Sequence, residues 1–186
     1  VSLRPLGGCG GDFDSRISRA VRDVSIKTGL SPVIVPMQGG EDRALCERIC
    51  ALSVGSAYTA PFSDADSIAA LFAGAAFTVG MRLHSIIYSA CVGTPVLAVS
   101  YDPKIDAACA YLGLPAPFSA FTVTSEEMLA SLPELSESVP RERIAYLRGL
   151  CEEDCRRIIG AVREERISDK EKARRHGRVG GYDDIY

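Results

Sequence analysis

The segment Ala75–Lys104, AAFTVGMRLHSIIYSACVGTPVLAVSYDPK, constrains the fold more than any other part of the chain. Residues 76–79 form a short apolar run that includes β-branched side chains, and residues 95–99 form another, so each predicts a buried strand. The small and apolar residues 85–91 between them predict a buried helix. The segment therefore predicts a strand–helix–strand unit, in which the two strands run parallel.

The same alternation continues along most of the chain. Further strands are expected at residues 1–4, 32–36, 56–59 and 118–123, and further helices at about 14–28, 42–52, 64–73, 104–112, 124–132 and 140–167. This order predicts an α/β fold, with a parallel sheet and helices on both of its faces. Right-handed crossovers then place all the strand ends at one edge of the sheet.

Length and composition predict one folded domain with a charged tail. The chain has 186 residues, of which 47% are hydrophobic, and this is enough for one ordinary core. We expect residues 1–167 to form the domain, and residues 168–186, dense in charge and poor in apolar side chains, to form a flexible tail. Because the chain begins directly on a predicted strand, we expect it to be a piece of a longer protein.

The net charge argues against nucleic-acid binding, and the length of the apolar runs argues against a membrane-spanning segment. A formal net charge of -3 gives no electrostatic footprint for nucleic acid. No apolar run is long enough to span a bilayer, and no secretory signal is visible, so a cytoplasmic location is expected. A solvated tail is favoured, but Arg174, Arg175 and Arg178 leave open a peripheral contact with anionic lipid at the inner face of the membrane.

The seven cysteines favour a reducing compartment. Cys46 and Cys50, and likewise Cys151 and Cys155, are four residues apart within helical patterns, so each pair falls on one helix face. That spacing matches neither a redox CxxC motif nor a zinc knuckle. The favoured interpretation is small buried hydrophobic residues, with a disulfide framework or a metal site as alternatives.

Polar and charged residues gather where the predicted strands end. They are Arg4, Gln38, Asp42, Arg82, His84, Tyr101 and Asp102. In an open α/β sheet these positions converge on one crevice, beside the N-termini of helices that favour negative charge. Arginine is suited to bidentate contacts with carboxylate or phosphate. The sequence therefore predicts an anion site without naming the anion.

Several of these residues also have a purely structural interpretation. His84, Asp42 and Asp102 could each serve to cap a helix, the last of them with Pro103 at the first helical position. Tyr101 could simply pack, and Lys104 is expected at the surface. The glycines of residues 7–11 form neither a GxGxxG motif nor a P-loop with its lysine, so a surface turn and a close approach to a ligand both stay open.

The motifs VGMRLHSIIYSACVGTPVLAVSYDPK, VSLRP and PMQGGEDRAL, which keep their order across residues 1–114, resemble the polysaccharide pyruvyl transferase family. Members of that family are two-domain proteins of GT-B-like architecture. The chain resembles their C-terminal half, which implies a Rossmann-like domain that binds the donor substrate and works with an N-terminal domain absent from this chain.

The resemblance also implies a reaction. The family transfers the enolpyruvyl group of phosphoenolpyruvate to two hydroxyls of a cell-surface polysaccharide sugar, forming a pyruvyl ketal and releasing phosphate. Arg4, Arg82 and His84 match the residues that hold phosphoenolpyruvate, with His84 as a catalytic acid or as a phosphate ligand. Phosphoenolpyruvate is then a co-substrate, no metal or other cofactor is implied, and the acceptor is a saccharide, with a lipid-linked one as an alternative.

Two rival functions stay open at this point. One is a GT-B glycosyltransferase or sugar-nucleotide epimerase half-domain that binds a UDP-sugar at the same sheet edge. The other is a binding or scaffolding domain that has kept the fold without catalysis.

Overall fold

The computed structural model describes residues 1–7, 10–53, 58–60, 64–136 and 141–176. The chain divides into two compact units, residues 1–144 and residues 145–186. The first unit contains every strand of the described chain and every predicted site residue.

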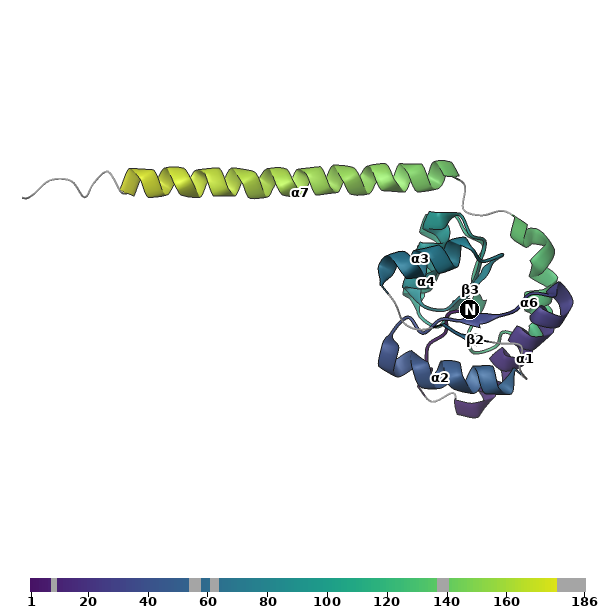
Figure 1. The fold of residues 1–186 in the computed structure, drawn as a ribbon. Coiled ribbons are helices and arrows are strands. Elements are labelled where there is room, and N and C mark those ends of the chain that lie inside the picture. The colour runs from purple at the N-terminus through teal and green to yellow at the C-terminus, as the bar shows by residue number, and fades with distance from the viewer. Residues whose placement is uncertain (8–9, 54–57, 61–63, 137–140, 177–186) are drawn as a thin grey trace, which may run out of the picture. The chain divides into compact units, whose positions relative to one another are not determined.

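The elements alternate along the chain and can be followed by colour in Figure 1. The strands are β1 (Val33–Ile34), β2 (Tyr58–Thr59), β3 (Thr78–Gly80), β4 (Val96–Ser100) and β5 (Phe118–Ser119). The helices are α1 (Gly10–Thr28), α2 (Gly39–Leu52), α3 (Ala65–Ala73), α4 (Leu83–Val92), α5 (Pro103–Leu112), α6 (Ser125–Ser131), the 3₁₀ helix η1 (Leu132–Ser136) and α7 (Arg141–His176).

All paired strands run parallel, as predicted. β1 pairs with β2, while β3 pairs with β4 and β4 pairs with β5. In register, Val79 lies opposite Leu97, and Val99 lies opposite Phe118. The α/β class with a small parallel sheet is therefore confirmed.

The first residues of the chain join the two groups of strands. On one side, Val1 donates to the Val33 carbonyl and accepts from the Val35 amide, both at 2.8 Å. On the other side, Ser2 donates to the Val79 carbonyl and accepts from the amide of Met81, again at 2.8 Å. The hydrogen-bonded order is therefore β2, β1, residues 1–3, β3, β4 and β5.

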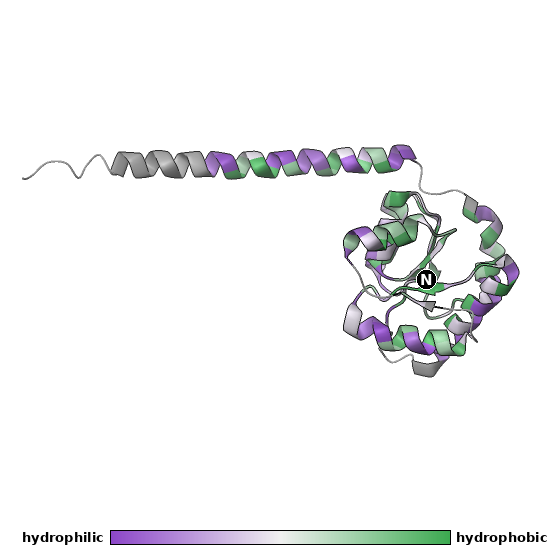
Figure 2. Ribbon diagram, in the orientation of Figure 1, coloured by the Kyte–Doolittle hydropathy of each residue, from purple (hydrophilic) through white to green (hydrophobic). Residues whose placement is uncertain are grey.

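The buried residues of β4 alternate between two layers. Leu97 and Val99 belong to a core cluster with residues of α1 and α2, whereas Val96 and Ala98 are buried outside that cluster. Because successive side chains of a strand point to opposite faces, both faces of the sheet are covered. Figure 2 shows the strands mostly in green, while α1 and α7 carry many hydrophilic residues in purple.

The strands are shorter than predicted and two helices begin earlier. Residues 1–4 form a single bridge, at Ser2, and the expected strand at 118–123 ends at Ser119. The helices α1 and α2 begin at Gly10 and Gly39, within glycine-rich stretches that the sequence assigns to loops. A first helical turn tolerates glycine because packing against the core, rather than local propensity, holds it in place.

The C-terminal helix continues past the predicted end near Ile167. α7 is helical to His176, so residues 168–176 of the expected tail are part of it, while 177–186 lie outside the described residues. The proposed lipid contact rests on this region, and the side chains of Arg174, Arg175 and Arg178 are not described. No helix in the described part of the chain is both long enough and apolar enough to cross a membrane.

The cysteines are only partly buried, which corrects the prediction for three of them. Among the six described cysteines, which are all free thiols, Cys46 and Cys109 are buried and Cys50 is half-buried, but Cys91, Cys151 and Cys155 are exposed. The seventh, Cys9, lies outside the described residues. The sequence spacing shows which face of a helix a cysteine occupies but not whether another element covers that face. Burial raises the pKa of the Cys46 thiol to about 12 and that of Cys109 to about 11, which makes both poor nucleophiles.

Candidate anion-binding site

Residues 1–3 and β3 lie side by side, and the chain leaves them in opposite directions. From residues 1–3 it continues through α1 to β1 on one side, and from β3 it continues through α4 to β4 on the other. Open α/β sheets bind ligands outside the carboxyl ends of the strands where the strand order reverses in this way. Arg4 follows the first segment and Arg82 follows the second.

Arg82 forms a bidentate ion pair with Asp42. Its Nε donates to Oδ2 of Asp42 at 3.1 Å, and its Nη2 donates to Oδ1. The Asp42 side chain is 0% exposed and also accepts the backbone N–H of Gln38 at 2.9 Å. A second carboxylate, that of Glu41, lies 3.7 Å from Arg82 Nη2 but is largely exposed. These bonds connect the start of α2 with the start of α4.

The N-termini of α2 and α4 carry no side-chain cap. Gln38 and Arg82 occupy the cap positions, and neither side chain accepts a hydrogen bond from the helix. Elsewhere in the described chain, Asp64, Asp102 and Thr124 cap α3, α5 and α6. The first N–H groups of a helix have no partner within it, so α2 and α4 retain the capacity to bind an anion.

Arg4, Tyr101 and Lys104 form a second group of polar side chains. Arg4 Nη1 donates to the Tyr101 hydroxyl at 2.9 Å, and its guanidinium carbon lies 4.5 Å from the centre of the tyrosine ring. Lys104 Nζ lies 5.4 Å from the same centre and 3.6 Å from Oδ2 of Asp102. No carboxylate of the described residues pairs with Arg4, and its buried Nε has no hydrogen-bond partner among them.

The two cations lower the pKa of their neighbours. Burial raises the pKa of Tyr101, but hydrogen bonds and charges from Arg4 and Lys104 together outweigh it, so the net pKa lies below the usual 10. The backbone N–H of Lys104, followed by the charges of Lys104 and Arg4, lowers the pKa of Asp102. The shift of Tyr101 reflects the positive charges of Arg4 and Lys104, which suit an anionic ligand.

His84 is the second residue of α4 and its side chain is exposed. Arg82 holds the cap position of α4, so His84 does not cap this helix. The structural interpretation of Asp102 is confirmed, because its Oδ1 accepts the Lys104 backbone N–H at 3.0 Å. Asp42 is not an N-cap, since Gln38 holds that position.

The structure thus places six of the seven predicted residues in two clusters, and His84 in neither. Arg82, Asp42 and Gln38 form one, and Arg4, Tyr101 and Asp102 form the other. Lys104 is exposed, as the sequence predicts, but sequence reasoning did not assign it to this cluster. The available signal was its position directly after Tyr101, Asp102 and Pro103, where a strand end turns into a helix.

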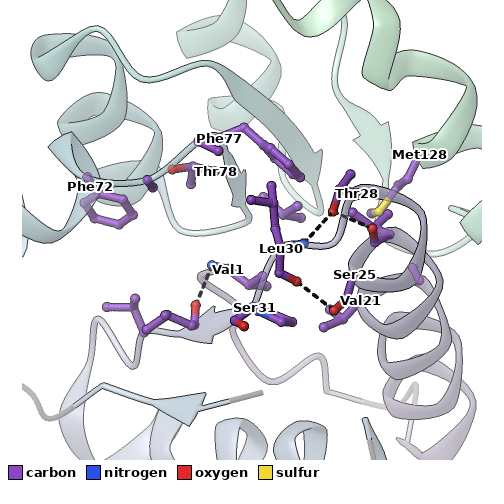
Figure 3. A pocket seen from close by; sticks show the side chains of 18 of the residues that line it. Val1, Val21, Ser25, Thr28, Leu30, Ser31, Phe72, Phe77, Thr78 and Met128 are labelled. Atoms are coloured by element: carbon purple, nitrogen blue, oxygen red, sulfur yellow. Dashed lines mark hydrogen bonds between the residues drawn. The ribbon is translucent and has the colours of Figure 1, made fainter. Parts of the chain in front are cut away.

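A well-formed cavity lies away from these clusters. It has a volume of about 270 Å³. Its mainly apolar lining comes from α1, from residues 30–33 and 35, and from the segment that leads into β3, and Figure 3 shows most of these side chains. None of the predicted site residues lines it. Among the described residues, no group of three His, Cys, Asp or Glu side chains could hold a metal ion.

Comparison with known proteins gives two matches. The family model described as polysaccharide pyruvyl transferase matches residues 5–103, a range that contains every predicted site residue except Arg4. The chain is also 31% identical over 106 residues to the amylovoran biosynthesis protein AmsJ of Erwinia amylovora. That match covers 57% of this chain but only 23% of the relative. No solved structure shows a significant match.

Proposed function

The chain belongs to the polysaccharide pyruvyl transferase family, and we propose that it forms the part of such an enzyme that binds phosphoenolpyruvate. The full reaction would transfer the enolpyruvyl group to two hydroxyls of a saccharide, as a pyruvyl ketal, and release phosphate. The remainder of the enzyme, including an N-terminal domain, would supply most contacts with the acceptor. We propose that this takes place in the cytoplasm, on a free acceptor or a lipid-linked one at the inner face of the membrane.

The sheet supports a Rossmann-like half of a GT-B architecture as part of this proposal. If residues 1–3 are counted as the first strand, the hydrogen-bonded order is 3-2-1-4-5-6, which is the order of dinucleotide-binding folds. The reversal point of this order lies between residues 1–3 and β3, where Arg4 and Arg82 leave the sheet.

One observation carries the assignment of the ligand. Arg4 and Arg82 follow adjacent strand ends, and the N-terminus of α4 at Arg82 has no side-chain cap. Cationic donors and backbone N–H groups therefore occur in one region of the fold. Phosphoenolpyruvate carries a carboxylate and a phosphate on one carbon, and it needs several such donors at once. Arg4, which has no carboxylate partner among the described residues, is the natural charged ligand for one of these groups.

The chemistry requires a proton donor as well as an anion site. A first sugar hydroxyl adds to the carbon that bears the phosphate while the methylene carbon gains a proton and becomes a methyl group. A second hydroxyl then displaces phosphate and completes the ketal. We propose that His84, whose exposed imidazole lies in the first turn of α4, moves a proton to the methylene carbon or assists the departure of phosphate.

The experiment that tests this function uses an enzyme that contains this chain. It would be incubated with phosphoenolpyruvate and saccharide acceptors, and phosphate release and the ketal methyl signal would be measured. We expect His84→Ala to lower the rate by about 10²–10⁴-fold, the usual contribution of an acid or base, while Arg22→Ala on α1 leaves it unchanged. Unaltered turnover in His84→Ala, or transfer from a UDP-sugar instead, would contradict the proposal.

A further inference from the structure

Asp42 is a buried carboxylate, and both of its oxygens accept hydrogen bonds. Its side chain is 0% exposed, and it accepts two hydrogen bonds from Arg82 and one from the backbone of Gln38. Burial of a charge is costly unless the charge is paired and hydrogen-bonded. The hydrogen bonds of the pair therefore offset the cost of burying its charges, and the loss of either residue would leave the charge of the other without a partner.

The pair also fixes the orientation of the Arg82 guanidinium. This group is planar and carries five N–H donors in a rigid fork. Nε and Nη2 are directed at Asp42, so the plane of the fork is set, and Nη1 has no acceptor among the described residues. Arg82 is the cap residue of α4, and its side chain keeps 13% of its surface exposed. Its free edge can thus donate to a ligand at that helix end.

We propose that Asp42 is the positioning residue for Arg82. It holds the guanidinium with one edge toward Asp42 and the other toward a bound anion, and it neutralises the charge of Arg82. Arg82 then serves as a directional hydrogen-bond donor, and the net positive charge for the anion comes from the cluster of Arg4 and Lys104. This inference rests on the proposed function, since it assigns a role to Asp42 within the phosphoenolpyruvate site.

The first test is a double-mutant cycle on the affinity for phosphoenolpyruvate, measured by calorimetry on this chain. We expect Asp42→Asn to weaken binding about tenfold when Arg82 is present and less than about twofold in the Arg82→Ala background. Glu41→Gln is the matched control, because Glu41 also lies near Arg82 but is exposed, and it should leave the affinity unchanged. Equal losses in both backgrounds, or the same loss in the control, would overturn the proposal.

A second test does not depend on phosphoenolpyruvate. In NMR spectra of the arginine side chains, the Nε–H of Arg82 should exchange slowly with solvent in the wild type and in Glu41→Gln, and rapidly in Asp42→Asn. Slow exchange that persists in Asp42→Asn would overturn the proposal. If the wild type does not bind phosphoenolpyruvate, the donor assignment fails, and this spectrum still decides whether Asp42 orients Arg82.

A third variant keeps the proposal testable if Asp42→Asn does not fold. Arg82→Lys keeps a positive charge opposite Asp42 but removes the bidentate fork. We expect it to stay folded, as thermal unfolding would show, and to bind phosphoenolpyruvate about tenfold more weakly. Unchanged affinity in Arg82→Lys would mean that charge alone matters, and it would overturn the positioning role.

Discussion

Arg4 lies over the ring of Tyr101, with its guanidinium carbon 4.5 Å from the ring centre, and its Nη1 donates a 2.9 Å hydrogen bond to the Tyr101 hydroxyl. The two residues are 97 positions apart in the chain and come from different strand ends. A guanidinium that stacks on a ring and also binds its hydroxyl is held by two contacts. Tyr101 therefore holds Arg4 in place and does not serve for packing alone.

The first prediction concerns the titration of Tyr101. Its pKa is lowered in the fold by Arg4 and Lys104, so one of the seven tyrosines should ionise below the usual value of 10. Because the folded pKa lies below the unfolded value, this ionisation favours the folded state above pH 10, and the contribution is lost as the pH falls through the folded pKa. Ultraviolet titration of tyrosinate measures it.

Two variants assign that titration to a residue. Tyr101→Phe should remove the early step, and Arg4→Ala should move it back toward the usual value of 10. An early step that survives in Tyr101→Phe would belong to another tyrosine and would contradict the contact between Arg4 and Tyr101.

The second prediction concerns Gly80, the last residue of β3. A Cβ at this position would lie 3.0 Å from Cγ1 of Ile86 and 3.1 Å from Oγ of Ser85, both in the first turns of α4. We expect Gly80→Ala to lower the free energy of unfolding by about 1–3 kcal/mol, because the buried Ile86 has little space to move. Denaturant unfolding would measure this loss.

Gly74→Ala is the matched control for Gly80→Ala. Its new Cβ would meet only the Ala70 and Leu71 carbonyls at ordinary contact distances of 3.6 and 3.8 Å. We expect its stability to change by less than about 0.5 kcal/mol. Equal effects of the two substitutions would show that β3 and α4 do not approach as closely as described.

The third prediction contrasts two buried serines. The Ser2 hydroxyl is buried without a hydrogen-bond partner among the described residues, whereas Ser89 donates to Oγ1 of Thr78 at 2.8 Å. Because an unsatisfied buried hydroxyl is costly, Ser2→Ala should leave stability unchanged or raise it by up to about 1 kcal/mol. Ser89→Ala should lower stability by about 1 kcal/mol. A loss of stability in Ser2→Ala, measured by thermal unfolding, would contradict this prediction and show that the hydroxyl has a partner.

The fourth prediction uses the two histidines as probe and control. His84 is the second residue of α4, near the proposed anion site, while His176 is the last residue of α7. We expect phosphoenolpyruvate to shift the imidazole NMR signals of His84 and to leave those of His176 unchanged. Equal shifts in both would indicate a change in bulk conditions rather than a site at α4.

The alternation of strands and helices was predictable because it depends on local patterns. Short apolar runs, and the glycines that interrupt them, predicted where each described strand lies. The Asp-Pro pair at residues 102 and 103 predicted the start of α5. Strand lengths and helix starts were less accurate. A residue such as Gly39 has low helix propensity, and it is helical because the tertiary structure supports the first turn.

The position of the predicted residues at the strand ends could be predicted from the sequence, but the pairing of their side chains could not. Parallel topology places strand ends at one edge, and that rule brought Arg4, Arg82 and Tyr101 to the same edge of the sheet. No pattern in the sequence shows that Asp42 is fully buried against Arg82, or that Lys104 turns back toward Tyr101. Those contacts depend on side-chain directions, which only the packed structure determines.

The most direct test of the central claim is a calorimetric titration of this chain with phosphoenolpyruvate, with UDP as the comparison ligand. We expect saturable binding of phosphoenolpyruvate, little binding of UDP, loss of binding in Arg4→Ala and unchanged binding in Arg22→Ala. This result would place the donor site at the end of residues 1–3 and β3. Preferential binding of UDP, or phosphoenolpyruvate affinity that survives in Arg4→Ala, would contradict the account.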